Sequence, residues 1–472
     1  MGGESSNCDC GFRNYVDAGT AQILQPCHTV SMFFGQTLLS DRRRLLQSLL
    51  AGVGASVLPL PGQAAAPAPQ GARLSADFDP VAAVWLGWDA GHEALTLALA
   101  NALWRHVPIR MLVRDRETEF RARALLSQSG LAAENLSFVR DSQALFFTRD
   151  VAVFGMDAGG RRFLADFRWT HYGWSEWCRR THGASRTQPE FCQRPDDPQA
   201  DELDRRLADA LGLPSFQSGL AMEGGGIEVN GRGLLIANEA LWHARNPELG
   251  REALQRAMLR LPGIRKVLWL PYGLAHDPLH RATITGNHVG WGTGGHTDEF
   301  VRFADARTVL LAWPDPAELR TDPVARLNLK RMQANYAVLA ASSTVEGERL
   351  RVVRVPLPRT VQRTVTLSAG ADTAYSEQWT AQSFPARERR REGQKVQQVA
   401  TTSYLNHVVA NGLVLLPDYL PHGTPPQRQE QVRDIYQAAF PGREIRFLDA
   451  ISLNWVGGGL HCATLSEPAG AA

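Results

Sequence analysis

Short apolar runs of strand length alternate with amphipathic helical segments along almost the whole chain, and this alternation limits the possible folds most strongly. The run at 81–88 is typical of a buried strand, and 322–342 has the length of a long helix. The dipeptide Asn230-Gly231 is a strong hairpin signal. Since no linker interrupts the pattern, we expect one mixed α/β domain over residues 72–472.

Repeated hairpins argue against a plain parallel doubly wound sheet and favour small, recurring mixed units. Strands are expected at 81–88, 108–113, 136–140, 151–156, 163–169, 267–270, 308–312, 351–357, 413–416 and 444–448, with a hairpin over 226–237. Helices are expected at 92–106, 117–128, 201–211, 247–261, 322–342 and 426–440. Three stretches are interpreted as long loops, which usually carry function or lack order: 169–192, 276–295 and 370–400.

Ahead of this domain, the chain has the features of an export signal. Arginines at 42–44 precede an apolar run at 45–60, and small residues follow at 63–66. Basic, apolar and small segments in this order make a secretory signal, and paired arginines are typical of twin-arginine export of folded proteins. We therefore expect 32–68 to be a signal peptide for the periplasm or the exterior, and 1–31 to be unstructured or a misassigned start.

The composition argues against several classes of partner. Hydrophobic residues make up 44% and charged residues 21% of the chain, as in soluble globular proteins. A formal net charge of +2 supplies no electrostatic reason to bind nucleic acid or a membrane surface. We expect neither as a partner once the signal is removed, and the sequence leaves the oligomeric state open.

The cysteines allow two interpretations. Cys178 and Cys192 lie in a tryptophan-rich stretch, and in an oxidising compartment they could form a disulfide worth about 3 kcal/mol. Two free thiols are the alternative. Cys8, Cys10 and Cys27 have no spacing typical of a zinc site, so no metal is predicted there.

Cys462 is the candidate nucleophile. It follows Gly457-Gly458-Gly459, whose backbone can pass close to another body. A thiol beside such a turn is suited to nucleophilic attack, because the thiolate is the reactive form and its pKa depends on its neighbours. A small buried hydrophobe is the alternative. Three further stretches carry polar groups suited to catalysis: Thr148-Arg149-Asp150, Met222-Glu223-Gly224-Gly225 and Gly294-Gly295-His296-Thr297-Asp298.

The base for Cys462 must come from outside its own segment. His461 is a poor candidate, because neighbours in an extended chain point to opposite sides. His296 and Asp298 are two residues apart and share one side, although they could also bind a metal or form a simple hydrogen bond. The stretches supply more carboxylates than one histidine needs, which implies a cationic substrate. Guanidinium fits best, through planar bidentate hydrogen bonds.

A longer series of motifs extends from Trp85 to Pro468. It comprises Trp85-Leu86-Gly87-Trp88, Arg149-Asp150, Asp166-Phe167-Arg168-Trp169, Glu223-Gly224-Gly225, Ala244-Arg245-Asn246-Pro247, Gly292-Thr293-Gly294-Gly295-His296-Thr297-Asp298 with Arg302-Phe303, Ser403-Tyr404-Leu405-Asn406, Phe440-Pro441-Gly442-Arg443-Glu444 and Gly457-Gly458-Gly459-Leu460-His461-Cys462-Ala463-Thr464. In this order the series resembles the agmatine deiminase and Porphyromonas-type peptidyl-arginine deiminase family of the guanidino-group-modifying pentein superfamily. The resemblance implies a pentein α/β-propeller of five ββαβ-like units around a central active site.

The resemblance also implies roles for the catalytic residues. Cys462 would attack the guanidinium carbon, while Asp150 and Asp298 grip the nitrogens. His296 would act as general acid for departing ammonia and later as the base that activates water, with Glu223 orienting it. The implied intermediate is a covalent S-alkylthiouronium, hydrolysed to a ureido product, and no metal or organic cofactor is implied.

The substrate beyond its guanidinium group is left open. Agmatine, giving N-carbamoylputrescine and ammonia, is the first expectation, and Gly459 joins Asp150 and Asp298 as an expected substrate-binding residue. However, the segment 146–152 departs from the Trp-x-Arg-Asp-x-Gly-Pro usual in agmatine deiminases, and an exported enzyme has less obvious use for polyamine synthesis. Peptidyl-arginine and free arginine, giving citrulline, are alternatives, as are amidinotransfer or dimethylarginine hydrolysis on the same fold. Outside enzymes, the alternative is an exported guanidino-compound binding protein.

Overall fold

The computed structural model describes residues 71–131, 133–183, 201–370 and 378–470. Contacts divide the chain into two compact units, residues 1–61 and 62–472, and the described residues all belong to the second. The predictions for 1–31 and for a signal at 32–68 lie outside the described residues. Within the described ranges, no helix combines the length and apolar character needed to cross a membrane.

Helices and strands alternate along the second unit. The helices are α2 (Glu93–Leu103), α3 (Arg116–Gln128), α4 (Trp174–His182), α6 (Leu203–Leu211), α7 (Glu239–Arg245), α8 (Arg251–Met258), α9 (Pro323–Ala340), α10 (Pro426–Ala439) and α11 (Ile451–Asn454). The strands are β1 (Arg73–Leu74), β2 (Val81–Gly87), β3 (Ile109–Val113), β4 (Leu136–Arg140), β5 (Val153–Met156), β6 (Arg162–Arg168), β7 (Ser215–Ala221), β8 (Glu228–Val229), β9 (Leu234–Asn238), β10 (Lys266–Leu270), β11 (Leu279–Thr285), β12 (His288–Thr293), β13 (Val301–Phe303), β14 (Thr308–Trp313), β15 (Arg351–Pro356), β16 (Gln362–Thr366), β17 (Lys395–Val399), β18 (Val408–Ala410), β19 (Leu413–Pro417), β20 (Glu444–Leu448) and β21 (Thr464–Pro468).

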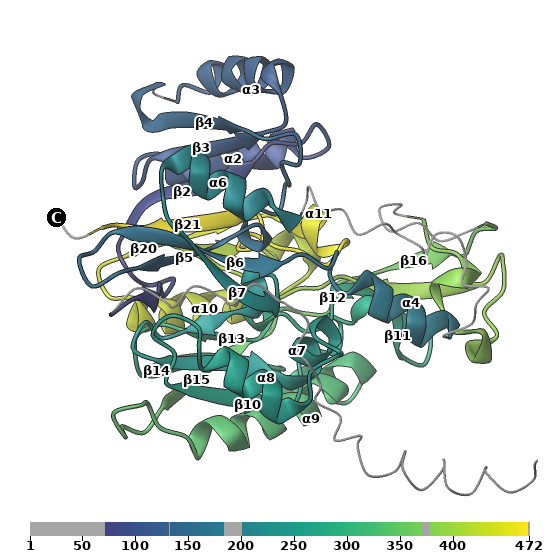
Figure 1. Ribbon diagram of the computed structural model, residues 1–472. Coiled ribbons are helices and arrows are strands. Elements are labelled where there is room, and N and C mark those ends of the chain that lie inside the picture. Colours follow the sequence, from purple (N-terminus) through teal and green to yellow (C-terminus); the bar gives the residue numbers. More distant parts are fainter. Residues whose placement is uncertain (1–70, 132, 184–200, 371–377, 471–472) are drawn as a thin grey trace, which may run out of the picture. The chain divides into compact units, whose positions relative to one another are not determined.

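In the described part of the chain, five small sheets repeat one pattern (Figure 1). A first strand pairs antiparallel with a second, and the second pairs parallel with a third that follows a helix. The five units are β21-β2-β3-β4, β5-β6-β7, β8-β9-β10, β13-β14-β15 and β18-β19-β20. This confirms the predicted mixed ββαβ-like units. The first unit takes its first strand from the C-terminal end of the described chain, so β21 closes the set.

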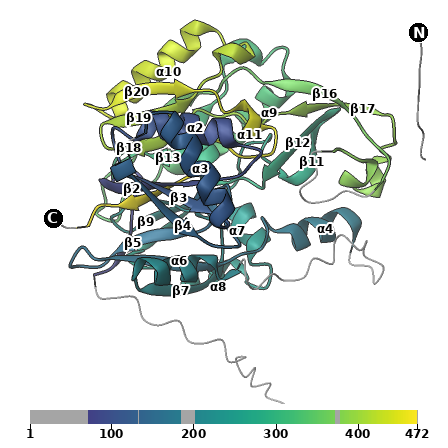
Figure 2. The same ribbon diagram turned by 90° about the horizontal axis from the view of Figure 1, so that it is seen from above.

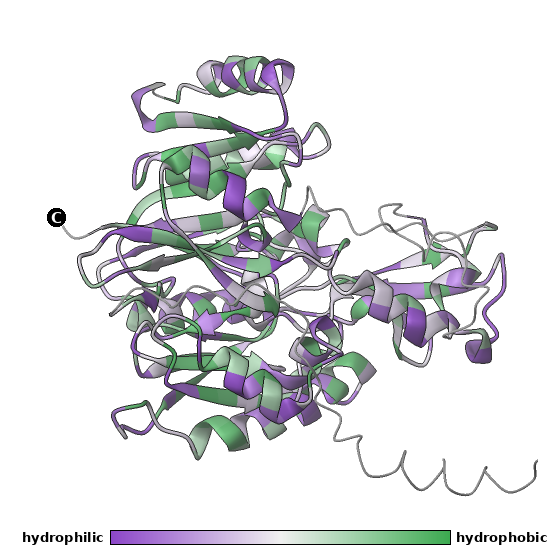
Figure 3. Ribbon diagram, in the orientation of Figure 1, coloured by the Kyte–Doolittle hydropathy of each residue, from purple (hydrophilic) through white to green (hydrophobic). Residues whose placement is uncertain are grey.

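The central strands β2, β9, β14 and β19 are largely apolar, whereas β6 also carries Arg162, Asp166 and Arg168. All residues of β9 and β19 are buried, as expected for strands covered on both faces. Figure 3 shows that the exposed helix α3, in contrast, alternates hydrophobic and hydrophilic residues. The long helix α9 begins where predicted, because Asp322 accepts a hydrogen bond from the Val324 amide at 2.7 Å and Pro323 follows at the first helical position.

A further sheet, β11-β12-β17-β16, lies outside the five units, with α4 beside β11 (Figures 1 and 2). The interpretation of 276–295 as a loop is therefore wrong, because this stretch contains β11 and β12. The loops expected at 169–192 and 370–400 are also wrong in part, since they include α4 and β17. Glycines hide the strand pattern of β12. A Cβ on Gly292 would overlap Asp277 Oδ1, so close packing requires glycine there.

Most other boundaries agree with expectation to within a few residues. The strands at 136–140 and 444–448 match fully. The helix expected at 247–261 is shorter in the structure, where α8 covers only Arg251–Met258. The helix α7, which precedes it, was not predicted. The short strands β13, β16, β18 and β21 were not predicted, since three to five residues carry little periodicity.

Candidate active site

The candidate site residues occupy the same position in successive units. Asp150 precedes β5, Glu223 precedes β8, Asp298 precedes β13, Asn406 precedes β18 and Cys462 precedes β21. The short 3-10 turns that carry or adjoin the first three, η2 (Thr148–Asp150), η4 (Gly224–Gly226) and η5 (Thr297–Glu299), contact one another in the order η2–η4–η5. Repetition of the unit therefore brings five segments that are distant in sequence to one place.

A buried chain of ion pairs contacts the His296 ring at Nε2. Its Nε2 lies 3.2 Å from Glu223 Oε2, and Arg245 Nε lies 2.8 Å from both oxygens of Glu223. Although burial opposes both shifts, Arg245 and His296 lower the pKa of Glu223 to about 2, and Glu223 with Asp150 raises the pKa of His296 to about 9. His296 is therefore an imidazolium at neutral pH.

The front of the His296 ring faces two carboxylates across the space left by a glycine. Nδ1 lies 4.0 Å from Asp150 Oδ1 and 4.0 Å from Asp298 Oδ1. A Cβ on Gly225 would come within 2.5 Å of His296 Nδ1, 3.0 Å of Asp298 Oδ2 and 3.1 Å of Asp150 Oδ1. His296 Nδ1 and Asp298 Oδ1 are buried without a hydrogen-bond partner among the described residues. Buried polar atoms normally have partners, so these atoms are arranged for a polar ligand.

Asp150 is held by its surroundings in a defined orientation. The Gly225 amide donates to Oδ1 at 3.1 Å, and the Tyr172 hydroxyl donates to Oδ2 at 3.0 Å. Burial raises the pKa of Asp150 to about 6, so a cation beside it is needed to keep it fully ionised. Tyr172 has a φ of 58°, in the left-handed region that non-glycine residues rarely adopt, and its ring centroid lies 6.1 Å from that of His296. Sequence reasoning missed Tyr172, which belongs to no recognisable motif.

Cys462 is 2% exposed and has one donor and one acceptor near its sulfur. Asn406 Nδ2 donates to Sγ at 3.1 Å, and Sγ lies 3.5 Å from Asp298 Oδ2. Asn406 Nδ2 also donates to Glu299 Oε1 at 2.7 Å. Burial, Asp298 and Glu299 raise the pKa of Cys462 well above its usual value, so the resting group is a thiol. A cation bound at the paired carboxylates would oppose this effect.

His461 contacts two carboxylates. Its Nδ1 lies 2.8 Å from Asp298 Oδ2, and its Nε2 lies 2.8 Å from Asp77 Oδ2. Sequence reasoning missed Asp77, which carries no motif, and it missed the role of Asn406, although the motif that ends at this residue was a usable signal. It also missed the role of Arg245, whose motif lies at the end of α7.

The three glycines before Cys462 each face a neighbour that leaves no room for a side chain. A Cβ on Gly457 would lie 2.8 Å from the Gly292 Cα, one on Gly458 would overlap the Phe147 ring, and one on Gly459 would overlap Asn406 Oδ1. Gly459 thus permits the close approach of Asn406 to the segment that carries Cys462. Its expected contact with substrate stays a prediction.

A metal could in principle use part of the same site. Asp298, Glu299 and Cys462 offer ligand atoms within 4.8 Å of one another. However, Asn406 already donates to both Glu299 and Cys462, and the unpartnered oxygen of Asp298 lies in the region of His296. These side chains therefore suit a hydrogen-bonding cation between two carboxylates better than a metal ion.

Of the two cysteines in the predicted disulfide, the structure describes Cys178. Cys178 lies in α4, is 1% exposed and is disulfide-bonded. Cys192 lies outside the described residues, so its pairing with Cys178 stays a prediction.

Comparison with known proteins identifies the family of this chain. The family model described as Porphyromonas-type peptidyl-arginine deiminase matches residues 73–468. Agmatine deiminase of Pseudomonas aeruginosa (strain LESB58) is 26% identical over 420 residues, which cover 85% of this chain and 97% of the relative. Agmatine deiminase of Stutzerimonas stutzeri is also 26% identical, with 85% and 97% covered.

Solved structures of similar proteins have the same fold. Agmatine deiminase of Enterococcus faecalis superposes with a TM-score of 0.61 at 21% identity, covering 84% of this chain and 96% of its own. Agmatine deiminase of C. jejuni with substrate bound superposes with a TM-score of 0.59 at 15% identity, covering 85% and 97%. The mixed α/β units of this chain are thus those of the pentein fold. On the match over 73–468, this chain belongs to the Porphyromonas-type peptidyl-arginine deiminase family.

Proposed function

We propose that this protein hydrolyses a guanidinium compound to a ureido product and ammonia, with agmatine as the first substrate to test. The observation that carries the proposal is the convergence of His296 Nδ1 and oxygens of Asp150 and Asp298 on the space at Gly225, with the Cys462 thiol beside Asp298. The relatives named agmatine deiminase support the choice of substrate.

Substrate binding supplies a hydrogen-bond donor for the unpartnered oxygen of Asp298. A guanidinium ion placed between Asp150 and Asp298 donates to both, and its positive charge keeps both carboxylates ionised. The same charge stabilises the thiolate of Cys462 against the burial that disfavours it in the resting protein. Binding thus converts the resting thiol into the nucleophile.

The first half of the reaction forms a covalent intermediate. The Cys462 thiolate attacks the guanidinium carbon, and Asn406 donates a hydrogen bond to the sulfur before its negative charge is lost in the new bond. His296 then donates the proton on Nδ1 to the departing nitrogen, which leaves as ammonia and completes an S-alkylthiouronium on Cys462. His296 ends this half neutral, still held at Nε2 by Glu223.

The second half regenerates the protein. Neutral His296 takes a proton from water, and the hydroxide attacks the thiouronium carbon. The tetrahedral intermediate collapses as the C–S bond breaks, and the proton of its hydroxyl group passes to the departing sulfur. This releases the ureido product and restores the Cys462 thiol. Arg245 keeps Glu223 ionised throughout, so the histidine returns to its protonated state.

We include export as part of the proposal. The arginines at 42–44 and the apolar run at 45–60 support a twin-arginine signal and action in the periplasm or outside the cell. In that location, peptidyl-arginine or free arginine, giving citrulline, would be substrates of the same chemistry.

The test is a substrate panel read out by ammonia and ureido product. Agmatine, free arginine and an arginine-containing peptide are each incubated with the wild type and with Cys462→Ala. We expect turnover of agmatine by the wild type, and none by the variant even where it still binds substrate. Turnover of arginine or the peptide alone would transfer the assignment to those substrates. Absence of product from all of them, with Cys462 still alkylated by iodoacetamide, would reject the function.

A further inference from the structure

The proposed chemistry requires a proton to leave a buried sulfur, and the structure indicates where it goes. The resting Cys462 is a thiol that is 2% exposed, and a bound guanidinium covers it further. The attacking form is the thiolate. A route for this proton rests on the proposed function, because without a cationic substrate the thiol has no reason to ionise.

His296 does not serve as the acceptor of this proton. Its pKa of about 9 means that the ring is already protonated at neutral pH, and it must keep that proton for the departing nitrogen. Among the described residues, the acceptor within hydrogen-bond distance of Sγ is Asp298 Oδ2, at 3.5 Å; the other polar neighbour, Asn406 Nδ2, is a donor. The thiol proton therefore meets Asp298 first.

Asp298 cannot keep the proton, since it must be ionised to hold the guanidinium. The same oxygen, Oδ2, contacts His461 Nδ1 at 2.8 Å, and His461 Nε2 contacts Asp77 Oδ2 at 2.8 Å. Sulfur, carboxylate, imidazole and second carboxylate thus form one continuous chain of hydrogen-bonding atoms. It leads away from the space at Gly225 where the substrate binds.

The two contacts of His461 allow a proton to pass through its ring. Nδ1 faces Asp298 Oδ2 and Nε2 faces Asp77 Oδ2, and each ring nitrogen can carry or accept a hydrogen. A proton that enters the ring at Nδ1 can therefore be matched by one that leaves at Nε2.

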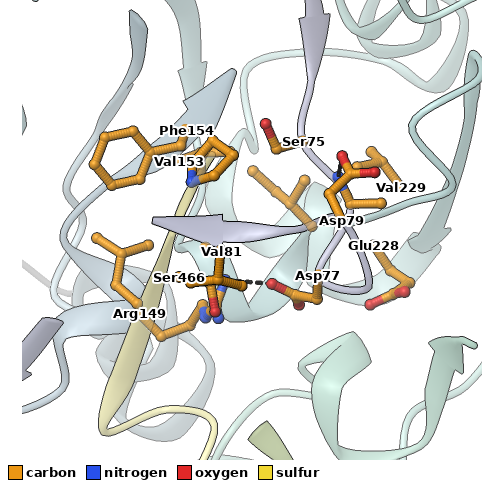
Figure 4. Close-up of a pocket in the computed structure, with 15 residues that line it drawn as sticks. Ser75, Asp77, Asp79, Val81, Arg149, Val153, Phe154, Glu228, Val229 and Ser466 are labelled. Atoms are coloured by element: carbon orange, nitrogen blue, oxygen red, sulfur yellow. Dashed lines mark hydrogen bonds and ion pairs between the residues drawn. The ribbon is translucent and has the colours of Figure 1, made fainter. Parts of the chain in front are cut away.

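The far end of the chain reaches a second pocket. Asp77, Glu228 and Arg149 are among the residues that line it (Figure 4), and it has a volume of about 30 Å³ available to water, enough for at least one molecule. The Asp77 side chain is 17% exposed, so it is not sealed from solvent. Arg149 Nη2 is buried beside it without a hydrogen-bond partner among the described residues, which suits an ordered water.

The charges around His461 favour release at this end. The ring faces Asp298 and Asp77, with Arg149 and Arg302 beyond them and His407 nearby. Burial, Arg149 and Arg302 lower the pKa of His461, so a proton that enters the ring is weakly held. Arg149 and Arg302 donate to Asp77 at 3.0 and 2.8 Å, which keeps Asp77 ionised and fixes its orientation.

We infer that Asp298, His461 and Asp77 form a proton outlet, through which the thiol proton of Cys462 leaves for water in the second pocket when a guanidinium compound binds. The S–H bond breaks and its electron pair stays on sulfur. One proton enters the chain at Asp298 Oδ2, and one leaves at the Asp77 end to solvent water. The three side chains hold the same number of protons before and after. His461 and Asp77 act through Asp298, and are thus positioning residues.

The experiment follows the proton directly. Wild-type protein is mixed rapidly with a substrate from the panel in weakly buffered solution containing a pH-indicator dye. We expect a release of about one proton per active site before ammonia appears, and no such release from Cys462→Ala. In His461→Gln the release should slow by about tenfold or more, since positioned proton-transfer groups contribute roughly 10²–10⁴ in rate.

A matched control lies in the same pocket. Glu228 contacts Arg302 Nε at 3.1 Å but not the outlet, and burial raises its pKa to about 8, so Glu228→Gln replaces a neutral acid by a neutral amide. This variant should release the proton as fast as the wild type. If His461→Gln fails to fold, Asp77→Asn interrupts the same chain at its outer end.

Two kinds of outcome distinguish the outlet from the proposed function. A protein that turns over a guanidinium compound without an early proton release, or a folded His461→Gln or Asp77→Asn variant that releases the proton at the wild-type rate, would overturn the outlet and leave the deiminase function intact. A protein that turns over no guanidinium compound would overturn the function itself.

Discussion

Replacing Glu223 by glutamine tests whether the carboxylate sets the charge of His296. In the wild type the pKa of His296 is about 9 against an ordinary 6.5, although burial alone would lower it. The difference corresponds to about 3 kcal/mol, since one pKa unit is worth ~1.4 kcal/mol. Loss of the Glu223 charge and hydrogen bond removes the largest contribution that raises this pKa.

The assay is the pH dependence of kcat/KM for ammonia release. As the general acid, His296 must be protonated, so the wild-type rate should fall as pH rises through about 9. In Glu223→Gln this alkaline limb should move down by about two pH units. Glu228→Gln serves as the control for removal of a buried carboxyl group. Thermal unfolding checks that the variant stays folded although Arg245 has lost its carboxylate partner and keeps its hydrogen bond to the Thr293 carbonyl. An alkaline limb at the same pH in wild type and Glu223→Gln would refute the reasoning.

Three further predictions concern the same site. Gly225→Ala should lower kcat/KM for ammonia release by about 100-fold, because the new Cβ would lie 2.5 Å from His296 Nδ1. Unchanged activity would contradict the proposed position of the substrate. Asn406→Ala removes the donor 3.1 Å from Cys462 Sγ, so it should slow turnover by about 10²-fold and also slow the alkylation of Cys462 by iodoacetamide. Equal alkylation rates in the variant and the wild type would exclude a role of Asn406 in stabilising the thiolate. The depressed pKa of Glu223 contributes stability above its ordinary 4.5 that is lost as pH falls from 4.5 to about 2, so acid unfolding of the wild type should be steeper over this window than that of Glu223→Gln.

The sequence alone determined the family and predicted the candidate catalytic side chains. The motifs around Asp150, Glu223, His296 and Cys462 are short, and their glycines have a local cause that can be read without a fold. A backbone that must approach another segment within van der Waals distance tolerates no Cβ, as Gly225 shows. The hairpin at 230–231 and the start of α9 were predictable for the same reason, since turns and helix caps depend on a few adjacent residues.

Only the tertiary structure decided which further groups reach those side chains. Asp77 meets His461 across 384 positions of sequence, and Asn406 meets Cys462 across 56, so no local pattern could connect them. In the sheet of β11, β12, β16 and β17, the glycines of β12 interrupt the apolar pattern, and only the fold shows that Gly290 and Gly292 pack against Pro278 and Asp277.

The charge states also belong to the fold. An ordinary histidine and an ordinary cysteine would titrate near neutrality and slightly above it, whereas here burial and neighbouring charges raise the pKa of Cys462 well above its usual value, and carboxylates raise that of His296 to about 9. The sequence identifies the candidate catalytic residues, because their types and glycine neighbours are local properties. Their protonation depends on burial and on charges supplied by other units, and those exist only once the chain has folded.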